Sequence, residues 1–283
     1  MEIINGAEMS AKILAQIKDK LASSADKPKL EIVFIGNNSA SQVYVAKKKE
    51  AGEACGIEVN VTHRLEATTQ EVKDIILKAA QDDSVNGIIL QLPAPNIDLE
   101  QVLPLIPLHK DVDGLNPLTL GRLWHNNIEL IPATVKAIIK VMEYIATKQG
   151  LELQPFLSGK RVLIINRSLI IGKPLAALLI NYDATVSIAH SKSGNLNEMV
   201  RISDIVISGT GQQGIFDIRE CKKDTILIDA GFSRQGDKVY GDIDLDADLN
   251  VSYLSPVPNG IGPIGVACLL ENTLQTFLDQ SKL

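Results

Sequence analysis

Lys160-Arg-Val-Leu-Ile-Ile165, Asn166-Arg-Ser-Leu-Ile-Ile-Gly172 and Lys173-Pro-Leu-Ala-Ala-Leu-Leu-Ile180 are three consecutive segments that decide the fold. Their composition predicts an apolar strand, a turn and a helix, in that order. Further apolar strands are expected at 185–189, 204–208 and 225–231. Strand, turn, helix and strand form the mononucleotide-binding unit of a Rossmann fold. The second half of the chain is therefore predicted to be α/β with a mostly parallel sheet.

The first half shows the same alternation of helices and strands. One helix is expected over 7–21 and a second from residue 40 to about 52–56. A third is expected from the capping box Thr68-Thr-Gln-Glu71 through Ala80. Strands are expected at 30–35, 57–61 and 85–90. A polar, irregular connection is predicted over 121–131, followed by a helix from Pro132. The change of composition at 121–132 marks the candidate domain boundary.

Composition and charge exclude several classes of protein. The net charge is −6 in 283 residues, with no basic stripe for nucleic acid. We expect no membrane segment, because no apolar run approaches about 20 residues. Cys55, Cys221 and Cys268 are scattered, which favours reduced thiols in a cytoplasmic protein. The four histidines are not paired at ligand spacing, so no metal site is expected.

Polar residues that could take part in catalysis or binding follow two of the expected strands. Tyr44 and Lys48 are four apart on a predicted helix and therefore share one face. Gln91 follows a buried strand directly, at the end where ligands of open α/β sheets bind. The alternatives stay open at this point: Tyr44 and Lys48 as residues of a solvated helix face, and Gln91 as an amide that caps a turn. Likewise, Asp113 precedes a glycine, a pair that is typical of turns.

The 166–172 turn lacks the G-x-G-x-x-G fingerprint, yet its place between a strand and a helix favours a nucleotide. We expect the helix after Gly172 to offer free N–H groups to a phosphate. The second strand ends in His190-Ser191-Lys192, without the carboxylate that binds the ribose of NAD. With Arg167 nearby, this pattern predicts NADP. The alternative is a nucleotide-free Rossmann-like domain with a basic loop.

Several spaced motifs, in one order, resemble the methylenetetrahydrofolate dehydrogenase/methenyltetrahydrofolate cyclohydrolase family. The motifs are Tyr44-Val-Ala-Lys-Lys48, Gln91-Leu-Pro-Ala-Pro95, Lys110-Asp-Val-Asp113-Gly, Arg167-Ser168 with Ile171-Gly172-Lys-Pro174, Tyr253-Leu-Ser-Pro-Val-Pro-Asn-Gly-Ile-Gly-Pro263 and Leu270-Glu-Asn-Thr273. The resemblance covers nearly the whole chain. It implies a two-domain α/β fold with a cleft between the domains: a folate-binding catalytic domain over 1–121, joined by a C-terminal helix at 264–283, and a Rossmann NADP-binding domain over 122–263.

The resemblance also implies two linked reactions, the oxidation of 5,10-methylenetetrahydrofolate by NADP⁺ and the hydrolysis of the methenyl product to 10-formyltetrahydrofolate. Lys48 would be the catalytic amine, Gln91 would hold it by a hydrogen bond, Tyr44 would stack beside the folate, and Asp113 would anchor the pterin. Further folate contacts are implied for Leu90, Leu92, Pro258, Asn259, Gly260, Ile261 and Gly262. Cofactor contacts are implied for Asn166, Arg167, Ser168, Gly172, His190, Ser191, Thr210, Gly211 and Phe232. A homodimer is expected on the same basis.

Four positions depart from the family pattern. Asn166 and Asn259 replace glycines, Gly265 stands where the family usually has Thr after Gly-Pro-Met, and Ala133 replaces Cys. Asn166 puts the close approach of a pyrophosphate in doubt, although Asn tolerates left-handed backbone geometry. These departures leave open a monofunctional enzyme or a non-catalytic NADP-binding paralogue. A shikimate- or amino-acid-type dehydrogenase would share only the cofactor half.

Overall fold

The computed structural model describes residues 1–236, 238–244 and 251–280. The chain forms two compact units: Ser10–Ala133 with Val266–Leu283, called here the catalytic unit, and Met1–Met9 with Thr134–Gly265, called the nucleotide unit. The predicted ranges placed 1–9, 122–133 and 264–265 in the opposite units. The first residues belong to the nucleotide unit because β1 (Glu2–Ile3) pairs in parallel with β11 (Tyr253–Ser255).

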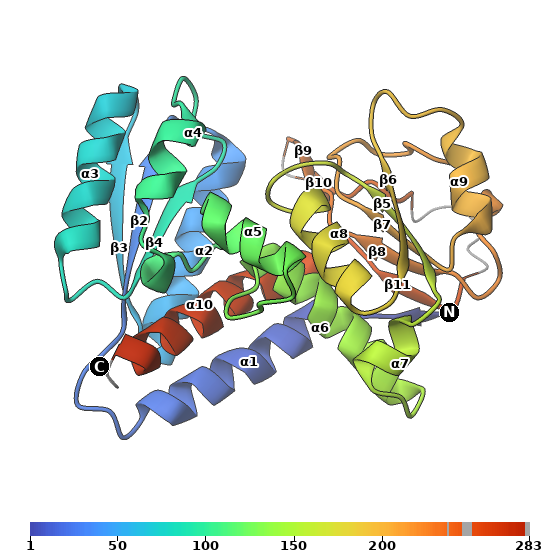
Figure 1. Cartoon of the computed structure of the whole chain (residues 1–283), viewed down its shortest axis with the longest axis horizontal. Helices are drawn as coiled ribbons and strands as arrows, with labels where there is room; N and C mark the ends of the chain where they lie inside the picture. The colour runs from blue at the N-terminus through green and yellow to red at the C-terminus, as the bar shows by residue number, and fades with distance from the viewer. Residues whose placement is uncertain (237, 245–250, 281–283) are drawn as a thin grey trace. The chain divides into compact units, whose positions relative to one another are not determined.

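The catalytic unit is built on a three-stranded parallel sheet in the order β3-β2-β4 (Figure 1). Its strands are β2 (Lys29–Ile35), β3 (Glu58–Arg64) and β4 (Gly87–Gln91). Helix α2 (Ser39–Cys55) packs on β3, and α3 (Thr69–Gln81) packs on β2 and β4. Phe34 lies opposite Gln91 in the register, so β2 and β4 end at the same edge of the sheet.

Local signals in the sequence set the ends of these helices. The side chain of Asn38 accepts a hydrogen bond from Ser41 N at the start of α2, and Gly56, with φ of 94°, ends it in the left-handed conformation. The capping box between Thr68 and Glu71 is confirmed at the start of α3. The irregular connection predicted at 121–131 is wrong in its first part. Helix α5 (Pro117–Trp124) covers it, because Asn116 caps the helix and Pro117 occupies its first turn.

The nucleotide unit contains a six-stranded parallel sheet in the order β1-β11-β8-β7-β5-β6. The predicted strands are confirmed as β5 (Arg161–Ile165), β6 (Thr185–Ala189), β7 (Ile205–Ser208) and β8 (Ile226–Asp229). The expected helix after the turn is α8 (Gly172–Asn181), which packs on β5 and β6. Together with α9 (Leu196–Ile202) it flanks the sheet (Figure 1). The fold is thus the predicted two-domain α/β type.

The remaining elements are mostly short. The helices are α1 (Gly6–Leu21), α4 (Leu99–Val102), η1 (Leu103–Leu105), η2 (Leu108–Lys110), α6 (Ala133–Lys148), α7 (Leu153–Leu157), η3 (Ile218–Glu220) and α10 (Ile261–Gln280). β9 (Ser233–Gln235) and β10 (Lys238–Tyr240) form an antiparallel pair. The end of the helix predicted to reach 283 lies outside the described residues. Among the described residues, no helix is long and apolar enough to cross a membrane.

Two helical glycines of the catalytic unit differ in what surrounds them, and this gives a stability test. A Cβ at Gly52 of α2 would lie 2.4 Å from Val59 Cγ2 of β3, whereas a Cβ at Gly121 of α5 would meet nothing within 4 Å. We expect Gly52→Ala to lower the free energy of unfolding by about 1–2 kcal/mol, because overpacking outweighs the gain in helix propensity. The control, Gly121→Ala, should raise it by about 0.5–1 kcal/mol. Urea unfolding measures both, and equal effects would contradict this account of α2.

Candidate active site

Lys48 and Gln91 meet at the carboxyl end of β4. Lys48 Nζ donates a hydrogen bond of 2.9 Å to Gln91 Oε1, and Gln91 Nε2 donates one of 2.9 Å to the carbonyl oxygen of Leu92. The second bond orients the amide so that its oxygen faces the amine. The hydrogen bond that the resemblance implied between the two side chains is therefore present. Tyr44 lies one turn earlier on α2. Both Tyr44 and Lys48 are half-buried, so they do not belong to a fully solvated helix face.

The environment of Lys48 favours its neutral form. Burial lowers the pKa of the Lys48 amine, and the negative charge of Asp113 opposes this by raising it. In return, burial raises the pKa of Asp113, and the positive charge of Lys48 opposes that shift. Burial also raises the pKa of Tyr44, which keeps its phenol protonated. The group thus combines an amine able to take a proton with a carboxylate in electrostatic range of it.

The three charged residues in the motif from Lys110 to Gly114 have different roles: two hold the structure together and one belongs to the candidate site. Lys110 is buried, and its Nζ donates hydrogen bonds of 2.9 Å to the carbonyl oxygens of Ala80 and Asp82 at the end of α3. Asp111 is buried and accepts hydrogen bonds from Leu115 N, Asn116 N and Thr119 Oγ1. Asp113 is the member of the motif whose charge acts on Lys48.

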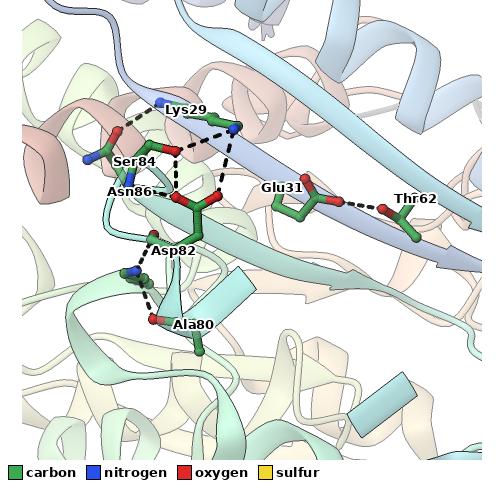
Figure 2. A network of polar contacts seen from close by, with 8 residues as sticks. Lys29, Glu31, Thr62, Ala80, Asp82, Ser84 and Asn86 are labelled. Carbon is green, nitrogen blue, oxygen red and sulfur yellow. Dashed lines mark hydrogen bonds and ion pairs between the residues drawn. The ribbon is translucent and has the colours of Figure 1, made fainter. Parts of the chain in front are cut away.

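A polar network continues from Lys110 and holds the end of α3 against β2. The Asp82 side chain lies 4.0 Å from Lys29 Nζ and accepts hydrogen bonds from the backbone and hydroxyl of Ser84 (Figure 2). Asn86 Oδ1 accepts a hydrogen bond of 2.8 Å from Lys29 N. These contacts fix the segment before β4, the strand that carries Gln91. These contacts stabilise the structure and do not include residues of the candidate catalytic group.

The other predicted folate contacts are dispersed. The Leu90 side chain is 1% exposed and belongs to the core, so it supports the sheet. Leu92 is half-buried and precedes a cis proline. Residues 258–262 belong to the nucleotide unit, where Asn259 adopts φ of 72°. Asn is one of the few non-glycine residues that accept this conformation, which accounts for its presence in place of glycine.

The turn between β5 and α8 is organised by Asn166. Its Oδ1 accepts hydrogen bonds from Ser168 N at 2.7 Å and Gly172 N at 3.1 Å, and its Nδ2 donates to Gly209 O. Its backbone is not left-handed, unlike that of Asn259, so the tolerance expected from the sequence is not the reason Asn fits here. The expectation of free N–H groups at the start of α8 is also wrong, because Asn166 and Ser168 accept hydrogen bonds from those N–H groups.

The remaining predicted cofactor residues lie after four neighbouring strands, β5, β6, β7 and β8, with Phe232 after β8. Arg167 and Ser191 follow β5 and β6 and are exposed, and His190 N donates a hydrogen bond of 2.9 Å to Ser193 Oγ within its own turn. Thr210 and Gly211 follow β7, and a Cβ at Gly211 would lie 3.0 Å from Phe232 O. Exposed cations with no carboxylate between 190 and 193 fit a phosphorylated ribose.

The sequence reasoning missed Asp242, which holds the turn after β7. Asp242 is 1% exposed and accepts hydrogen bonds from Ser208 Oγ, Thr210 N, Thr210 Oγ1 and Gln212 N. Asp229, at the end of β8, is equally buried and accepts from Gly231 N and Ile243 N. The sequence does place a glycine near each acid, Gly231 after Asp229 and Gly241 before Asp242. Only the structure shows that each glycine packs against the other acid: a Cβ at Gly231 would lie 2.0 Å from Asp242 Oδ1, and one at Gly241 would lie 2.0 Å from Asp229 Oδ2.

Comparison with known proteins agrees with this geometry. Residues 4–113 match the tetrahydrofolate dehydrogenase/cyclohydrolase catalytic domain, and residues 132–281 match the NAD(P)-binding domain of the same family. The chain belongs to the tetrahydrofolate dehydrogenase/cyclohydrolase family. Lys48, Gln91 and Asp113 fall inside the first match, and Asn166 to Phe232 fall inside the second.

Relatives and solved structures extend over the whole chain. The bifunctional protein FolD of Lactococcus lactis is 38% identical, covering 97% of this chain and 96% of its own length. The crystal structure of the bifunctional enzyme FolD from Campylobacter jejuni has a TM-score of 0.91 at 34% identity, with 99% of each chain covered. The FolD structure of Trypanosoma brucei, complexed with NADP and an inhibitor, has a TM-score of 0.91 at 30% identity, with 99% and 98% covered.

Asp229 should make stability depend on pH. Burial, with the charge of Asp242, raises the pKa of Asp229 from 3.8 to about 6, against the opposing hydrogen bonds from Gly231, Asp242 and Ile243. A raised pKa in the folded state stabilises the protein below the unfolded pKa, and this contribution is lost as the pH rises through about 6. Between pH 5 and 7 the loss should be about 1 kcal/mol.

Urea unfolding of wild type and Asp229→Asn at pH 5 and 7 measures this contribution. The variant should show a smaller loss with rising pH, whatever its absolute stability. Asp224→Asn removes an exposed carboxylate of the same unit and serves as the control. Equal pH dependence in wild type and Asp229→Asn would contradict the assignment.

Proposed function

We propose that this protein oxidises 5,10-methylenetetrahydrofolate to 5,10-methenyltetrahydrofolate with NADP⁺ and hydrolyses that product to 10-formyltetrahydrofolate. The observation that carries the proposal is the hydrogen bond from Lys48 to Gln91, with the charge of Asp113 acting on the same amine. Family membership over both domains supports it, as do the full-length relatives that bear the name bifunctional protein FolD.

Lys48 would serve the hydrolytic reaction as a base. A water molecule adds to the methenyl carbon and transfers one proton to the neutral amine, which leaves a hydroxyl group on that carbon. The bond from that carbon to N5 then breaks as the hydroxyl loses its proton to form the formyl C=O and N5 gains a proton, so that N10 keeps the formyl group. The amine can take this role because burial lowers its pKa. Gln91 Oε1 accepts one N–H of the amine and thereby restricts the direction of its lone pair.

The other members of the catalytic group would position the folate. Asp113, an acceptor-only group when ionised, suits the donor-rich edge of the pterin. Tyr44 stays a neutral phenol and would lie against the folate rings. The 258–262 loop would contribute further substrate contacts. The oxidation depends mainly on holding the one-carbon unit in position, since the cofactor supplies the reactivity for the hydride transfer.

NADP⁺ supplies the hydride acceptor when it is bound. Arg167 and Ser191, exposed at the ends of β5 and β6, would contact its 2′-phosphate. His190 would lie beside its adenosine. Ser168, Gly172, Thr210, Gly211 and Phe232 would line the path of the dinucleotide along the ends of β5, β7 and β8. A homodimer, expected from the family resemblance, and a cytoplasmic location, expected from the scattered cysteines, are further parts of the proposal.

Lys48→Met tests the division of roles. We expect it to lower cyclohydrolase kcat by about 10²–10⁴-fold, the usual contribution of a general base, while methylenetetrahydrofolate oxidation falls much less. A spectrophotometric assay follows NADPH formation and, separately, loss of preformed methenyltetrahydrofolate, with NAD⁺ in parallel. Lys47→Met, an exposed neighbour on α2, is the matched control and should change neither rate. If folded wild type shows neither activity, the proposal fails, and a non-catalytic paralogue becomes the better account.

Asp113→Asn should move the pH profile of the cyclohydrolase. The charge of Asp113 raises the pKa of Lys48, so its removal should lower that pKa further. The neutral amine then persists at lower pH, and the acidic limb of the kcat profile shifts to lower pH. Any effect on folate binding would appear in KM and leave the direction of this shift unchanged. A limb that stays in place or moves to higher pH would argue against Lys48 as the titrating base.

A further inference from the structure

We propose that Asn166 determines how the nucleotide is recognised: its carboxamide occupies the phosphate-binding position at the start of α8, so that the 2′-phosphate, and not the pyrophosphate, supplies most of the anion recognition. This inference rests on the proposed binding of NADP at the 166–172 turn. It assigns Asn166 a role opposite to that of a cofactor ligand, because the side chain competes with the pyrophosphate.

The hydrogen bonds of Asn166 resemble those that a bound phosphate would make. One acceptor atom, Oδ1, takes hydrogen bonds from two backbone N–H groups of the turn, Ser168 N at 2.7 Å and Gly172 N at 3.1 Å. The Nδ2 group donates to Gly209 O, which holds the carboxamide between the ends of β5 and β7. Asn166 is half-buried, so this arrangement is part of the turn itself.

The first turn of α8 has its N–H groups satisfied within the chain. Ile171 N donates to Ser168 Oγ at 3.1 Å, Gly172 N to Asn166 Oδ1, and Lys173 N to Ser168 O at 3.1 Å. Pro174 has no N–H to offer. Helix N-termini bind anions through free N–H groups, so a pyrophosphate could use this one only by displacing an internal acceptor.

Gly172 supports the same conclusion. A Cβ at this position would lie 2.1 Å from Asn166 O and 2.7 Å from Arg167 Cα. The chain therefore needs glycine here for its own close packing, and approach of a pyrophosphate is not required to explain it. Exposed positive charge near this turn comes from Arg167 and Lys192, after β5 and β6, where a ribose phosphate is bound in Rossmann folds, and from the side chain of Lys173 in the first turn of α8.

Asn166→Gly should therefore improve binding of the dinucleotide. It frees the N–H groups of Ser168 and Gly172, and we expect NADP⁺ to bind about tenfold more tightly, as a charge-assisted hydrogen bond allows. 2′-AMP, which carries the 2′-phosphate and adenosine but no pyrophosphate, should bind as it does to wild type. Isothermal titration calorimetry measures both ligands without any need for turnover.

Two further variants make the test specific. Asn166→Asp keeps an acceptor for the two N–H groups and adds a negative charge, so NADP⁺ should bind about tenfold more weakly while 2′-AMP changes much less. Asn195→Gly makes the same substitution as Asn166→Gly at the start of α9, where the Asn side chain forms no capping hydrogen bond, and should leave both affinities unchanged. The thermal unfolding midpoint of each variant establishes that it is folded.

The outcomes separate this inference from the proposed function. If wild type binds NADP⁺ and Asn166→Gly binds it no better, or if the variant changes NADP⁺ and 2′-AMP alike, Asn166 only organises the turn and the inference is overturned. If Asn166→Gly does not fold, Asn166→Asp decides: an unchanged NADP⁺ affinity overturns the inference, and a selective loss supports it. If folded wild type binds neither ligand, the proposed cofactor site itself fails.

Discussion

Removal of an amine from water is the constraint on which the catalytic unit depends. Burial lowers the pKa of Lys48 and so makes its amine a better candidate for a base, and an amine drawn out of water needs a hydrogen-bond partner. Gln91 Oε1 provides that partner from the end of β4. The close packing of α2 on β3 at Gly52 brings the lysine to this position. The asparagine cap at Asn38 and the left-handed Gly56 set the length of the helix that carries it.

Buried carboxylates organise the turns in both units. Asp111 in the catalytic unit and Asp242 in the nucleotide unit each accept several hydrogen bonds from backbone and hydroxyl groups. Those to Asp111 come from the turn before α5 and from the first turn of that helix, and those to Asp242 come from the turn after β7. An acceptor-only group suits this task, because turns leave N–H groups without partners in a helix or sheet. Asn166 performs the equivalent task with an uncharged carboxamide. Because the carboxamide carries no charge, it adds no negative electrostatic potential that would repel an anionic ligand near this turn.

Most of the framework could be predicted from the pattern of apolar residues. β7 and β8 are buried along their length, as β5 is from Val162 onward, and all three appear as apolar runs; the capping box at Thr68 identifies the start of α3. The short strands β1 and β11 could not be found this way. They belong to the sheet through pairing between Glu2–Ile3 and Tyr253–Leu254, more than 200 positions apart, and carry no periodic signal of their own. Helix α5 was missed because its eight residues are too few to show a clear period.

The sequence by itself determined the alternation of strands and helices, the place of Lys48 one turn after Tyr44, and the presence of Gln91 at a strand end, because these follow from local periodicity and turn chemistry. Only the tertiary structure decided which charges are structural. Lys110 and Asp113 stand three residues apart in one motif, yet one caps α3 and the other acts on the amine of Lys48. It also decided that Asn166 uses its side chain and not its backbone conformation, since its partner Gly209, which follows β7, reaches it only when the strands assemble.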